Sequence, residues 1–108
     1  MNTTPTVYRQ GDIAIIYPAS TPKPGALIPR IGGRIVLAHG KVTGHDHAIP
    51  SVDADLFELD GTPDRLLVAR APVQLVHDEH ATIDLPAGAA IVRRQVEYTP
   101  EASRQVED

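Results

Sequence analysis

Short aliphatic runs, each ended by glycine, proline or aspartate, divide this chain into pieces. Apolar residues do not recur over any long stretch at the three-to-four-residue spacing of an amphipathic helix. Runs of about four to eight apolar and β-branched residues between turn residues are typical of strands. The pattern therefore predicts an all-β fold, a small β-barrel or sandwich.

The expected strands cover residues 7–9, 13–17, 34–38, 45–49, 56–59, 65–69, 72–76, 82–85 and 89–98. The run 13–17 is apolar on both faces, which indicates a central strand. Asp60-Gly61 lies between two of the runs and favours a hairpin of 56–59 with 65–69.

The segments outside these runs are rich in proline or polar. Residues 18–29 contain four prolines and are expected to form a long connection. Residues 100–108 are polar and predict a short helix or a loose tail, and residues 1–5 predict a flexible start. We expect residues 1–108 to form a single β domain, since 108 residues is the size of one domain.

Composition removes several classes of function. The absence of cysteine excludes disulfides, thiolate-bound zinc, iron–sulfur clusters and a cysteine nucleophile. A net charge of −4 with one basic pair, Arg93-Arg94, argues against nucleic acid as a partner. No apolar run approaches the roughly 18 residues of a membrane span. Without an apolar leader after a basic start, we expect a cytoplasmic protein with no membrane partner.

Four of the five histidines form two tight groups, Gly44-His45-Asp46-His47 and His77-Asp78-Glu79-His80. If 45–49 is extended, His45 and His47 project from the same face and Asp46 from the other. His77 and His80 would oppose each other in a strand but could converge across a bend. Because imidazole suits both zinc and iron, the two groups predict a divalent metal ion on His45, His47, His77 and His80.

The ligand number decides what such an ion does. Three histidines, with His80 as third member and His77 as fourth ligand or neighbour, leave a position open for water and a small-molecule substrate. A metal-bound water with Glu79 as general base then predicts a hydrolase. A three-histidine Fe(II) oxygenase is the related alternative. Four histidine ligands would instead close a structural site, for example between subunits of a homo-oligomer.

Simpler interpretations stand beside these. Both histidine groups could lie in exposed loops and titrate near pH 6.5, in which case the chain would be a partner-binding domain without metal. His39 is expected to end a strand rather than to bind metal. One of Arg93 and Arg94 could bind a substrate carboxylate or phosphate, although we favour a structural pair with one residue in an ion pair and one solvated.

Two resemblances add to this reading. The chain resembles a group of small uncharacterised bacterial proteins. Four stretches carry this resemblance: Gly40–His47, His77–His80, Leu85–Gly88 and Arg94–Tyr98. His45, His47 and the Pro86-Ala87-Gly88 turn are also similar to cupins, which implies a small barrel with His45 and His47 as first metal ligands. The chain departs from cupins because no glutamate closely follows His47 and because His77 and His80 precede the turn.

Overall fold

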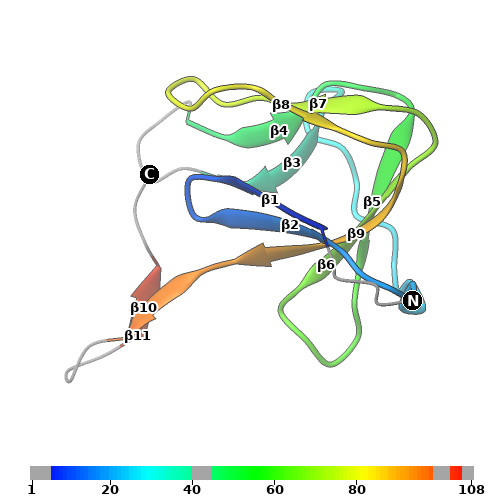
Figure 1. Ribbon diagram of the computed structural model, residues 1–108, viewed down its shortest axis with the longest axis horizontal. Helices are drawn as coiled ribbons and strands as arrows, with labels where there is room; N and C mark the ends of the chain where they lie inside the picture. Colours follow the sequence, from blue (N-terminus) through cyan, green and yellow to red (C-terminus); the bar gives the residue numbers. More distant parts are fainter. Residues whose placement is uncertain (1–5, 40–44, 99–102, 106–108) are drawn as a thin grey trace.

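The computed structural model describes residues 6–39, 45–98 and 103–105. All regular secondary structure within these residues is β-strand (Figure 1). In this part of the chain no helix long and apolar enough to cross a membrane is found. The strands are β1 (Thr6–Gln10), β2 (Ile13–Tyr17), β3 (Ile35–Ala38), β4 (His47–Ile49), β5 (Ala54–Glu58), β6 (Arg65–Ala69), β7 (Val73–Leu75), β8 (Ile83–Leu85), β9 (Gly88–Arg94), β10 (Val96–Tyr98) and β11 (Ser103–Gln105). The expected all-β class is confirmed.

One antiparallel sheet holds the order β1-β2-β9-β6-β5. β2 lies inside it between β1 and β9, as its apolar run predicts. Directly paired residues share a face, so the register places Ile15, Val92 and Arg65 in one row across the sheet. Ile15 and Val92 are buried, whereas Arg65 is exposed to solvent.

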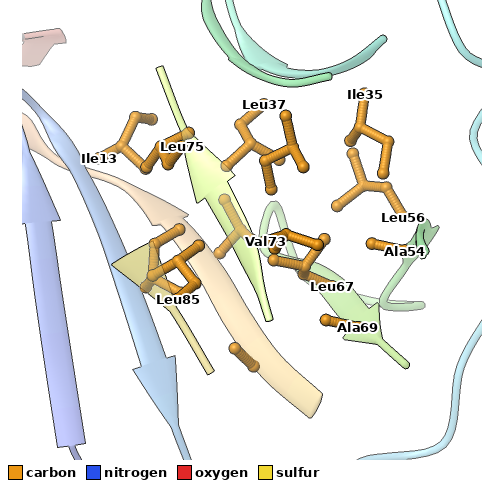
Figure 2. Close-up of a cluster of buried hydrophobic side chains, with 14 of the residues drawn as sticks. Ile13, Ile35, Leu37, Ala54, Leu56, Leu67, Ala69, Val73, Leu75 and Leu85 are labelled. Carbon is orange, nitrogen blue, oxygen red and sulfur yellow. The ribbon is translucent and has the colours of Figure 1, made fainter. Parts of the chain in front are cut away.

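Two shorter pairs, β3–β4 and β7–β8, lie across the inner face of this sheet (Figure 1). Backbone hydrogen bonds between Ala48 and Val76 join β4 to the end of β7, with N···O distances of 3.0 and 2.8 Å. Figure 2 shows the core between the layers, where side chains from both meet, among them Ile13, Leu37, Leu67, Leu75 and Leu85. The described sheets are open, and they do not close into a barrel.

The proline-rich connection at 18–29 is long, as expected, but it does not hang free. Ala26 accepts a hydrogen bond from the Glu58 backbone N–H at 2.8 Å, and Ile28 donates one to Leu56 at 2.8 Å. These bonds pair the connection with the outer edge of β5. A covered edge is less prone to pair with another chain.

The polar C-terminal segment corrects one expectation. Ser103–Gln105 is neither helix nor loose tail but a strand that pairs antiparallel with β10. Backbone hydrogen bonds between strands do not depend on apolar side chains, so a pattern of hydrophobic residues gives no signal for this hairpin. The expected flexible start at 1–5 lies outside the described residues.

Tyr17, at the end of β2, supplies a prediction at alkaline pH. Its hydroxyl donates to the Pro86 carbonyl at 3.0 Å, and its ring meets Tyr8 edge-on at 5.8 Å. Burial, and then the neighbouring Tyr8, raise the pKa of Tyr17 from 10.0 to about 12. The unfolded chain therefore ionises first, so this phenol lowers stability as pH rises from 10.0 towards 12.

We expect Tyr17→Phe to remove the step near pH 12 from the ultraviolet titration of tyrosine. The variant should also lose stability less steeply than the parent above pH 10 in urea unfolding, while at neutral pH the lost hydrogen bond costs about 1 kcal/mol or less. If the variant instead loses a titration step near pH 10.0, the raised pKa is not that of Tyr17.

Candidate metal centre

Four histidine rings from two stretches of chain meet at one end of the layers. We call His45, His47, His77 and His80 the histidine cluster. The ring centre of His77 lies 4.4 Å from that of His47, 4.5 Å from that of His80 and 5.9 Å from that of His45. The rings of His47 and His80 are 5.8 Å apart and nearly parallel. The independent, solvent-facing arrangement considered for these groups is therefore not the one observed.

Strand pairing explains why the two stretches meet. His47 opens β4 opposite Ala38 of β3, beside a β-bulge. His77 follows directly after Val76, whose bridge to Ala48 places it next to β4. Between β7 and β8 the chain leaves the strand conformation, which supplies the expected bend and returns His80 to the same side. One backbone bridge thus brings both groups together.

A buried glutamine fixes the orientation of His47. The Gln10 amide nitrogen donates to the carbonyls of Leu75 and Ala81 at 3.0 and 2.9 Å, so its oxygen is the atom facing His47. That oxygen lies 2.9 Å from His47 Nδ1 and accepts its N–H. In the neutral ring the lone pair is then on Nε2.

The lone pair of His47 faces a buried carboxylate. Asp12 Oδ1 lies 3.6 Å from His47 Nε2, and both side chains are 0% exposed. The other oxygen, Oδ2, accepts a hydrogen bond from Arg94 Nε at 2.7 Å. Sequence reasoning missed Gln10 and Asp12. The available signal was a glutamine at an inward position of β1 and an aspartate in the turn that follows.

Glu79 contacts two members of the cluster. Its backbone N–H donates to His77 Nδ1 at 3.0 Å, so the neutral ring of His77 carries its proton on Nε2. Its carboxylate lies 3.2 Å from His45 Nδ1 and is 57% exposed. Glu79 therefore stands at the rim of the cluster, between His45 and solvent.

A family model for a domain of unknown function, DUF8820, matches residues 9–95. The chain belongs to the DUF8820 family. The matched range contains the whole histidine cluster together with Gln10, Asp12 and Arg94. No curated protein and no solved structure matches the chain. The expected kinship with uncharacterised proteins is confirmed at this level, and no match supports the cupin resemblance.

His39 lies apart from the cluster in the DUF8820 domain. Its Nδ1 is 3.2 Å from the Asp46 carboxylate, which also accepts from Arg34 at 3.3 Å. Burial tends to raise the pKa of Asp46, but the hydrogen bonds and charges of His39 and Arg34 outweigh it, and the pKa is lowered. The Asp46 carboxylate thus contacts Arg34 and His39. Because β4 begins only at His47, the expected strand at 45–49 is shorter than predicted and Asp46 precedes it.

The basic pair also differs from the favoured expectation, because both arginines form ion pairs. Arg93 donates to both oxygens of Asp64, at 2.8 Å in the shortest hydrogen bond, and this bonding raises the pKa of Arg93. Arg94 turns to the inner face of the sheet, where it holds Asp12 and donates to the His39 carbonyl at 3.2 Å. Neither arginine is simply solvated.

The histidine cluster does not form a complete metal coordination site in the observed conformation. Among the described residues, no three histidine, aspartate or glutamate side chains are arranged so that they could hold a metal ion as they stand. An ion at this place would therefore require these side chains to rearrange. The arrangement offers several nitrogen and oxygen donors at close range, with Gln10 and Arg94 already orienting two of them.

Proposed function

We propose that the DUF8820 domain binds a divalent metal ion, zinc or iron, at the histidine cluster. The observation that carries this proposal is the approach of His47 Nε2 to Asp12 Oδ1 at 3.6 Å. Two donor atoms of the types that bind zinc or iron, an imidazole nitrogen and a carboxylate oxygen, are thus held close together by buried side chains.

Metal geometry supports this interpretation. Two ligand atoms bound at about 2.0 Å to a tetrahedral zinc ion lie about 3.3 Å apart, and two bound imidazole rings have centres about 5 Å apart. The rings of His47 and His80 have centres 5.8 Å apart, close to that value. His47, Asp12 and His80 are the ligands we propose first, with His45 at the rim.

His77 has a different role in this proposal. Its Nδ1 already accepts the Glu79 N–H, so in the observed conformation it offers a proton rather than a lone pair to the cluster. It serves as a ligand only if the ring turns away from Glu79. Without that turn, it packs between His47 and His80 and orients their rings.

The chemistry that fits best is hydrolysis of a small molecule by metal-activated water. A site with three protein ligands keeps one position for water, and zinc lowers the pKa of that water to about 7. In this proposal Glu79 acts as general base, and its exposed carboxylate beside His45 supports that role. Solvent access on that side supports an open site.

A closed structural site is the second candidate, favoured by burial. His47 is 0% exposed and His77 8% exposed, which is less than a substrate would need at those two rings. If four side chains surround the ion, the domain would bind metal for stability alone. The same experiment separates the two candidates.

The test is metal analysis of the full chain expressed without a histidine tag. We expect about one zinc or iron per chain by elemental analysis, and a visible spectrum of the Co²⁺-substituted protein typical of nitrogen and oxygen ligands. A shift of that spectrum with azide indicates an open site, and indifference to azide indicates the closed site. Absence of stoichiometric metal, together with failure to bind added Zn²⁺ and Co²⁺, would rule out both.

A further inference from the structure

A cavity of about 490 Å³ opens between β3 and the five-stranded sheet, beside the buried Asp12–Arg94 pair. Its volume falls in the range of about 300–1,000 Å³ that is usual for small-molecule sites. Much of its wall is apolar and comes from both layers and from the connection before β3, including Ile13, Ile28, Ile31, Val36 and Val92. Such a wall fits a hydrocarbon body.

Two arginines form much of the polar part of the wall. Arg65 and Arg94 line the cavity, and so does Asp64, but Arg93 binds both oxygens of Asp64 and offsets its charge. Among the described residues Arg65 donates one long hydrogen bond, to the Leu37 carbonyl at 3.4 Å. A guanidinium has five N–H donors in a planar fork that matches a carboxylate.

Arg94 retains donors although it is partly engaged. Within the described part of the chain its Nε binds Asp12 and its Nη2 binds the His39 carbonyl. The remaining N–H groups belong to the terminal nitrogens of a side chain that is 23% exposed. Because Asp12 and His39 hold this guanidinium in place, an incoming anion would not have to order it.

We infer that this cavity binds a small amphipathic carboxylate, with its acid group on Arg65 and Arg94 and its hydrocarbon part against the aliphatic wall. The site is distinct from the proposed metal centre: none of its lining residues is a proposed ligand, and Arg94 links the two sites by binding Asp12. It does not need a metal ion. If the domain is a hydrolase, this ligand is the class of substrate or product that the enzyme would take.

The apolar wall decides between kinds of anion. A free phosphate or a phosphorylated sugar would leave the aliphatic side chains without an apolar contact. Its own polar groups would also lose water against that wall, which costs free energy. A medium-chain carboxylic acid satisfies both parts of the wall. Octanoate is therefore the probe of choice, and its neutral amide is the matched comparison.

The test is a titration of the full chain with octanoate and with octanamide, followed by two-dimensional NMR of the ¹⁵N-labelled protein. We expect saturable octanoate binding with a dissociation constant of about 1 mM or tighter, and clearly weaker binding of the amide. Arg65→Gln should weaken octanoate binding at least about tenfold, because a charge-assisted hydrogen bond is lost. Arg70→Gln removes an exposed arginine at the far end of β6, paired with Asp55, and should leave binding unchanged.

The outcomes separate this inference from the metal proposal. Octanoate binding that persists after treatment with EDTA and falls in Arg65→Gln supports the cavity whether or not the protein binds metal. Binding that disappears with EDTA and ignores Arg65→Gln would overturn it, since the acid would then sit on the ion. Absence of saturation up to about 10 mM, or equal affinity for acid and amide, would also overturn it.

Discussion

Replacing His47 by alanine is expected to lower the affinity of the domain for Zn²⁺ and Co²⁺ by about a hundredfold or more. The variant removes a buried imidazole that Gln10 orients through Nδ1, with Nε2 directed at Asp12. Without His47, the proposed ion would also lose the ligand next to Asp12. Competition titration with a chromophoric chelator measures the change.

His39→Ala is the matched control for that prediction. It removes the same kind of ring from the same region of chain, but one that lies beside Asp46 and is 64% exposed. We expect its metal affinity to equal that of the parent. Equal affinities of His47→Ala and the parent would refute the proposed centre.

The loss of a buried ring could also unfold the protein, so a second variant guards the test. His80 is partly exposed and stacks on His47 at 5.8 Å. His80→Ala should keep the fold, judged by circular dichroism, and still weaken metal binding at least tenfold, as expected on losing a ligand. Retained affinity in this folded variant would remove His80 from the ligand set.

Leu67→Ala is expected to destabilise the domain by about 3 kcal/mol, within the range seen for buried leucines. Leu67 is 0% exposed and lies in β6, paired with Leu56 of β5 on one side and Ala90 of β9 on the other. Its side chain enters the core beneath the second layer (Figure 2).

Urea unfolding followed by circular dichroism measures this loss of stability. Val52→Ala provides the surface control, because Val52 is 78% exposed and should change the unfolding free energy by about 0.5 kcal/mol or less. If Leu67→Ala matched Val52→Ala, the assigned core would be wrong. Metal-free protein is used for both, so that binding does not contribute.

The sequence predicted strands more readily than their partners. The apolar runs at 13–17 and 65–69 carry enough local pattern to identify β2 and β6, and Asp60-Gly61 marks the hairpin of β5 with β6. The neighbours of β9 could not be read in this way. It pairs with β2 and β6, which are distant along the chain, and such pairing depends on which faces can be buried together.

The candidate site shows the same division. The spacing of His45 and His47 predicted that they would act together, and the bend after Val76 was expected. Gln10 and Asp12 were missed because they belong to another layer and their meaning depends on contacts across the core. A glutamine in a strand is ordinary until two carbonyls and an imidazole are found around its amide.

By itself, the sequence determined that this chain builds strands and carries four histidines in two groups, from which we predicted a metal site. Alternation along a strand and the chemistry of histidine are local properties, so they can be read from neighbouring residues. Only the tertiary structure decided that Asp12, Arg94 and Gln10 stand against His47, and that a cavity opens beside Arg94. Those relations arise from burying the faces of two layers against each other, and no single segment contains that information.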